Sequence, residues 1–86
     1  MQYYSDHLQN AKVENGVCTL TARLETEDSI TSASINTLGK VDLLYGRIEV
    51  RARIPSALGT WPAIWLLGIN KNEIGWPACG EIDVME

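Results

Sequence analysis

Glu81-Ile82-Asp83-Val84-Met85-Glu86 is a run in which acidic and apolar side chains begin by alternating. The alternation predicts a β-strand, because successive side chains of a strand point to opposite faces. Glu81 and Asp83 then share one face, while Ile82 and Val84 point toward a core. Strict alternation would turn Glu86 away from the two acids, whereas a one-residue bulge near Val84-Met85 would return it to their face. The sequence therefore predicts a bulged strand with three carboxylates on one side.

Three carboxylates on one face repel one another, and this cost to folding points to chemistry that needs them. Retaining cleavage of a glycosidic bond uses a carboxylate nucleophile and a carboxylic acid roughly 5–5.5 Å apart. Four residues of ideal strand span about 13 Å, so the strand must bend or a sugar must lie between the acids. An exposed acidic face without catalysis stays open as an alternative. Metal binding is the weaker alternative, since His7 is the one histidine and is distant in sequence; we predict no metal and no cofactor.

Three longer segments carry a resemblance to a known family. They are residues 45–55 (YGRIEVRARIP), 59–68 (GTWPAIWLLG) and 75–86 (GWPACGEIDVME). In this order they closely resemble glycoside hydrolase family 16, in its bulged laminarinase and β-glucanase branch. Residues 31–37 (TSASINT) and 3–6 (YYSD) also resemble that family, so the resemblance covers nearly the whole chain.

The resemblance implies both a fold and an activity. The fold is all-β: a jelly-roll-like, concanavalin-like β-sandwich catalytic domain. The activity is endo-hydrolysis of β-1,3- or mixed β-1,3-1,4-glucan with retention, in which Glu81 is the nucleophile, Asp83 the assisting acid and Glu86 the acid/base. A β-glucan-binding fragment with weak or no hydrolysis is the alternative function.

The length bears on how this fold would be completed. Sandwich domains often run to about 200–250 residues, whereas this sequence has 86. We therefore expect residues 1–86 to be a partial catalytic domain, truncated after the catalytic strand. Part of a sandwich leaves sheet edges and an inner face bare, and such surfaces recruit partners. The expectation is a homo-oligomer that completes the sandwich by self-association.

Composition excludes other function classes. The net charge of −4, with seven scattered basic residues, argues against nucleic-acid binding, which needs clustered Lys and Arg. No apolar run approaches the roughly 20 residues of a membrane span, so no membrane association is expected. The first residues lack the basic start and apolar stretch of a signal peptide. Secretion is implied by the family resemblance alone.

The local patterns predict strands throughout and no helix. Asn15-Gly16 predicts a hairpin turn, because a tight primed turn requires positive φ angles; the flanking strands are 13–14 and 17–24. Further strands are expected at 30–36, at 46–54 with its apolar residues inward, and at 63–67, fully buried. The residues expected on the inner apolar face are Leu20, Ala22, Ile48, Val50, Ile64 and Ile82.

The remaining candidates are polar and aromatic residues outside the acidic strand. Trp76, Trp61 and Trp65 are candidates for stacking against sugars, although Trp65 lies in an apolar run, where core packing is favoured. Asn36 matches a polar position in the family, which implies that its amide bridges sugar hydroxyls; a structural Asn at a strand end or turn is the alternative. Cys18 and Cys79 lack metal-site spacing, and buried free thiols are favoured over a disulfide.

Overall fold

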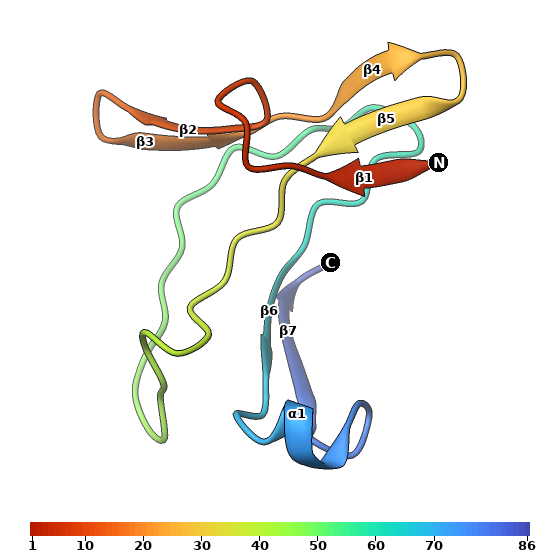
Figure 1. Cartoon of the computed structure of the whole chain (residues 1–86). Helices are drawn as coiled ribbons and strands as arrows, with labels where there is room; N and C mark the ends of the chain where they lie inside the picture. Colours follow the sequence, from red (N-terminus) through yellow and green to blue (C-terminus); the bar gives the residue numbers. More distant parts are fainter. The chain divides into compact units, whose positions relative to one another are not determined.

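The computed structural model describes residues 1–86, and its regular structure is nearly all β. The chain forms two compact units, Met1–Asn36 and Thr37–Glu86. The all-β prediction is confirmed, and one short helix is present that was not predicted. The elements, labelled in Figure 1, are β1 (Gln2–Tyr4), β2 (Ala11–Glu14), β3 (Val17–Leu20), β4 (Arg23–Thr26), β5 (Ser29–Ser32), β6 (Ile64–Leu67), α1 (Lys71–Ile74) and β7 (Glu81–Met85).

The first unit contains a β-hairpin and a three-stranded sheet. Strands β2 and β3 pair antiparallel around a turn in which Asn15 and Gly16 have φ angles of 51° and 76°. These positive angles belong to the predicted primed turn, so the hairpin is confirmed. The sheet has the order β1-β5-β4, with β1 parallel and β4 antiparallel to β5.

The predicted strand 17–24 is wrong as a single element, because it is divided at Thr21 and Ala22. The backbone N–H of Thr21 donates to the carbonyl of Asn10 (2.7 Å), and the side-chain amide of Asn10 donates back to the carbonyl of Thr21 (3.0 Å). After this point the chain leaves β2 and pairs with β5. A change of pairing partner ends one ladder and begins another, and the hydrophobic pattern alone does not encode it.

Asn10 lies at this change of partner and is almost completely buried, with 1% of its surface exposed. Its side-chain amide also donates to the hydroxyl of Thr31 on β5 (2.9 Å). That hydroxyl donates in turn to the carboxylate of Glu25 on β4 (2.8 Å), which also pairs with Arg23 (3.6 Å). The first unit is therefore joined internally by a polar network rather than by an apolar core.

The second unit contains an antiparallel pair, β6 and β7, joined by a turn, α1 and a further turn. Figure 1 shows the two strands side by side with α1 at the end where the connection lies. The backbone N–H of Gly68 donates to the carbonyl of Gly80 (3.3 Å) and closes the connection at its base. No space exists for a side chain at Gly68, since a Cβ there would collide with the carbonyl oxygen of Cys79. The connection therefore requires glycine at this position.

Two strand predictions fail in this chain for one physical reason. Residues 46–54 form no strand, and the predicted strand 30–36 ends at Ser32. Alternation favours an extended backbone, but a strand exists only where a neighbour supplies hydrogen bonds. Residues 46–54 and residues 33–36 pair with no other strand.

The predicted burial is also wrong. No apolar side chain in the chain is buried: Ile48 and Val50 are 41% and 52% exposed, and Ile82 is 68% exposed. Strand 63–67 is found at Ile64–Leu67, but it is only half-buried, and its Trp65 is exposed. Both cysteines are free, but the predicted burial is wrong for both, because Cys18 is exposed and Cys79 is half-buried. A sandwich core requires a second sheet facing the first, and the second unit contains a single two-stranded sheet.

Candidate active site

A β-bulge in β7 sets which side chains share a face with the carboxylates. Opposite residues pair as Leu67↔Glu81, Leu66↔Ile82 and Trp65↔Asp83, and the next pair is Ile64↔Met85. Val84 is therefore the extra residue, and the predicted bulge is confirmed. Residues directly opposite one another share a face; this face, here called the acidic face, comprises Glu81, Asp83, Trp65 and Leu67.

The bulge also reverses the faces to which the side chains after it point. Met85 pairs with Ile64, and Ile64 lies on the face opposite to Trp65. Met85 is accordingly on the far side of the strand from Asp83, and it is half-buried. Alternation continued by one position returns Glu86 to the acidic face. Without Val84 as an extra residue, Glu86 would point to the other side.

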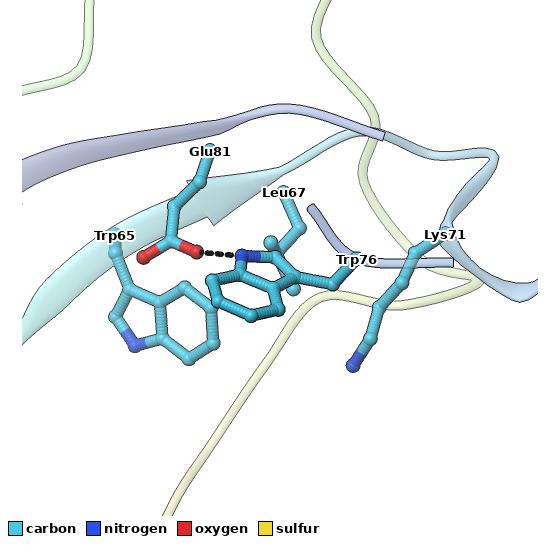
Figure 2. Close-up of a pocket in the computed structure, with 5 residues that line it drawn as sticks. All are labelled: Trp65, Leu67, Lys71, Trp76 and Glu81. Carbon is cyan, nitrogen blue, oxygen red and sulfur yellow. Dashed lines mark hydrogen bonds between the residues drawn. The ribbon is translucent and has the colours of Figure 1, made fainter. Parts of the chain in front are cut away.

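Glu81 is held by a hydrogen bond from a tryptophan. The indole N–H of Trp76 donates to one carboxylate oxygen of Glu81, Oε2, over 2.6 Å. Figure 2 shows the Glu81 side chain extending toward this nitrogen, with the Trp65 ring beside it. A hydrogen bond to an ionised acceptor is shorter and stronger than a neutral one. The bond therefore fixes the carboxylate orientation at the start of β7.

The backbone between α1 and β7 brings Trp76 to this position. The N–H of Gly75 donates to the carbonyl of Lys71 (2.7 Å), the N–H of Cys79 to the carbonyl of Gly75 (2.9 Å), and the N–H of Gly80 to the carbonyl of Pro77 (3.0 Å). Gly75 and Gly80 have φ angles of 75° and 81°, which residues with a Cβ rarely adopt. These turns fold the indole back over the first residue of β7.

A hollow of about 400 Å³ lies on this side of the strand pair. Its volume is within the range of ligand pockets. Trp65 and Trp76 are 48% and 63% exposed, so their ring faces are open to a ligand next to a carboxylate. In Figure 2, Lys71 lies beyond Trp76 from Glu81. The lining residues are Trp65, Leu67, Lys71, Trp76 and Glu81.

The structure brings together some of the predicted site residues and not others. Glu81, Asp83 and Trp76 lie in one short stretch of the second unit, and Glu86 follows β7 directly. Trp61 precedes β6, is 78% exposed and does not line the hollow. Asn36 belongs to the first unit. The three ion pairs of the structure involve none of the three acids.

Sequence reasoning misplaced Trp65 and overlooked Lys71. The favoured core position of Trp65 is wrong, because its side chain is exposed and lines the hollow. Alternation within 64–67 already separates Trp65 from Ile64 and Leu66, and the pairing with Asp83 then places it on the acidic face. Lys71 carries no local signal, because the short helix that presents it could not be recognised from periodicity over four residues.

Comparisons with known proteins identify the family of this chain. Residues 3–86 match the family described as XgeA-like, catalytic GH16 domain. A β-glucanase of Rhodothermus marinus is 47% identical over 92 residues, covering all of this chain and 32% of that protein. A glucan endo-1,3-β-glucosidase A1 of Niallia circulans is 36% identical over 95 residues, again covering the whole chain but 14% of the relative. This chain thus spans about a third of the first relative and less of the second.

A solved structure extends the comparison to the fold. The laminarinase catalytic domain of Thermotoga maritima MSB8 superimposes with a TM-score of 0.88 at 48% identity, over 98% of this chain and 35% of that domain's chain. The predicted sandwich fragment is thereby confirmed. Together with the family match over residues 3–86, this shows that the chain belongs to glycoside hydrolase family 16, in the group of XgeA-like catalytic domains.

Proposed function

We propose that residues 1–86 form part of a catalytic domain that hydrolyses β-1,3- or mixed β-1,3-1,4-glucan internally and with retention. The observation that carries the proposal is the bulged strand β7, which puts Glu81 and Asp83 on one face; alternation continued past Met85 would return Glu86 to that face. Two relatives support the substrate class, because one is a β-glucanase and the other a glucan endo-1,3-β-glucosidase.

The proposed reaction has two steps, each using both glutamates. Glu81 attacks the anomeric carbon while Glu86 protonates the leaving sugar oxygen, and a covalent glycosyl-enzyme forms. Glu86 then takes a proton from water, which attacks the same carbon and releases Glu81. Asp83, on the same face between them, is proposed to assist Glu81 by sharing a proton. Because the two glutamates are well separated along the strand, the sugar is expected to lie between them.

The tryptophans of the hollow are proposed to bind the sugar. A pyranose ring has C–H faces that pack on flat aromatic surfaces, and Trp76 and Trp65 expose such surfaces beside Glu81. Trp61 and Asn36 remain proposed contacts for more distant sugar units. Neither a metal nor a cofactor takes part in the proposed reaction.

Glu81→Ala tests the function directly. Release of reducing sugar from laminarin and barley glucan should fall by several orders of magnitude, and azide should restore turnover of an activated aryl glycoside through a glycosyl azide of inverted configuration. Glu73→Ala is the matched control, since Glu73 is an exposed carboxylate on α1 that does not line the hollow. Full activity of folded Glu81→Ala would refute the proposal.

A second function, β-glucan binding without hydrolysis, is favoured by one comparison. A β-1,3-glucan-binding protein of Penaeus monodon is 47% identical over 57 residues, which is 66% of this chain. Retarded migration in native gels containing laminarin, with no sugar released by the wild-type protein, would establish this alternative in place of hydrolysis.

Two proposals concern location and assembly. We propose that the protein acts outside the cell, because polymeric glucan does not cross a membrane; activity in the culture medium rather than in the cell extract is the test. No helix in the structure is long and apolar enough to cross a membrane. We also propose that the exposed apolar side chains are covered by self-association, since contiguous apolar surface promotes association.

A further inference from the structure

We propose that Trp76 does more than contact substrate: its indole N–H stabilises the carboxylate of Glu81 as that carboxylate leaves the covalent intermediate. The inference rests on the proposed function and deepens it, because it assigns to one hydrogen bond a role in one of the two steps. The observation behind it is the 2.6 Å contact from Trp76 Nε1 to Glu81 Oε2.

The contact distinguishes the two oxygens of the carboxylate. The indole nitrogen can only donate a hydrogen bond, and an ionised carboxylate can only accept. Trp76 occupies Oε2, and the structure shows no hydrogen bond to Oε1 from another side chain. The geometry thus assigns Oε1 to the attack on the anomeric carbon and Oε2 to the donor.

The two steps use this donor differently. In the first step, an electron pair of Oε1 forms the bond to the anomeric carbon, the glycosidic C–O bond breaks with its electron pair on the leaving oxygen, and Glu86 protonates that oxygen. The negative charge of Glu81 is consumed. A donor on Oε2 orients the nucleophile here, but it also stabilises the charged reactant, so the two effects oppose each other.

In the second step, orientation of the carboxylate and stabilisation of its charge both favour the reaction. Water attacks the anomeric carbon and gives a proton to Glu86, while the bond to Oε1 breaks with its electron pair returning to Glu81. Charge develops over both carboxylate oxygens, and the N–H already aligned with Oε2 stabilises it. Donors aimed at developing charge are a main source of catalytic stabilisation. The donor should therefore accelerate release of the intermediate more than its formation.

The position of Trp76 suits this role. Three backbone hydrogen bonds among residues on either side of Trp76 hold the turns from α1 to β7, so little reorganisation is needed when charge develops. The residue is 63% exposed in the free protein, and a bound sugar would exclude water from the contact. Hydrogen bonds strengthen when the surroundings become less polar.

Trp65 offers an internal comparison. It lines the same hollow and presents an exposed ring, but the structure shows no hydrogen bond from it to Glu81. If only ring area matters, replacing either tryptophan by phenylalanine should have a similar kinetic effect. If the N–H donor matters, the substitution at Trp76 should have an additional effect that the one at Trp65 lacks. Trp76→Phe and Trp65→Phe make this comparison.

The experiment uses a dinitrophenyl β-laminaribioside, whose activated leaving group makes hydrolysis of the intermediate the slow step. Trp76→Phe should lower kcat about tenfold, the size expected for one hydrogen bond to a charged group, while kcat/KM changes less than threefold. Intact-protein mass spectrometry should show the glycosyl adduct accumulating at Glu81. Trp65→Phe should lower kcat/KM at least as much as kcat, without accumulation. The same pattern in Trp76→Phe would overturn the inference.

Two further measurements keep the test decisive. If Trp76→Phe does not fold, replacement of Trp76 by 3-benzothienylalanine removes the N–H with almost no change of shape, and the same slow release is expected. Labelling of the wild-type protein with a 2-deoxy-2-fluoro glycoside tests the proposed function separately. An adduct on Glu81 together with unaltered release in the Trp76 variants overturns only the role of Trp76. No adduct on Glu81 overturns the proposed function as well.

Discussion

Asn10 is predicted to be the residue on which the stability of the first unit depends most. Its side-chain amide donates to the Thr21 carbonyl (3.0 Å) and to the Thr31 hydroxyl (2.9 Å), and only 1% of its surface is exposed. Asn10→Ala removes both bonds at about 1 kcal/mol each and leaves the half-buried Thr21 carbonyl without this donor, at about 1–2 kcal/mol more. The free energy of unfolding should fall by about 3–4 kcal/mol, a large share of the stability of a small protein.

Asn10→Asp separates hydrogen bonding from packing. The side chain keeps its shape, but an acceptor replaces the amide that faces the Thr21 carbonyl, so the loss should be at least as large as for Ala. Gln9→Ala is the control, because Gln9 is exposed in the same turn and should change stability by less than about 0.5 kcal/mol. Urea titrations followed by circular dichroism measure the three variants. Values for Asn10→Ala and Gln9→Ala that agree within error would refute the reasoning.

The remaining predictions concern the second unit and the assembly. Gly68→Ala should destabilise the β6–β7 connection by about 1–3 kcal/mol, because its Cβ meets the Cys79 carbonyl; an unchanged thermal midpoint contradicts this. Deletion of Val84 should turn Glu86 to the other face and abolish glucan hydrolysis while Glu81 remains open to labelling; retained hydrolysis argues against the bulge as the positioning device. Glu86→Gln should impair polymer hydrolysis far more than cleavage of an activated aryl glycoside, which needs little proton donation; equal losses would speak against Glu86 as the acid. Light scattering at micromolar concentration should detect an oligomer, and a cooperatively folded monomer would rule out self-association.

The sequence alone predicted the features that depend on local backbone geometry. Asn15-Gly16 predicted the hairpin because both residues tolerate the positive φ angles that its turn requires. The run 81–86 predicted both the shared face of Glu81 and Asp83 and the bulge near Val84. The acids follow a period of two, and a third acid out of phase with that period indicates where an extra residue must be inserted.

Tertiary structure decided which segments have partners and which faces are open. Residues 46–54 alternate as clearly as any strand in the chain, yet they form none here, since the hydrogen bonds of a strand come from another segment. Trp65 has an apolar neighbour on either side, and only its pairing with Asp83 places it beside the carboxylates. The bond from Trp76 to Glu81 joins residues five apart through turns set by Gly75 and Gly80. Alternation fixes the face to which a side chain points, whereas the contacts on that face depend on where the chain folds back.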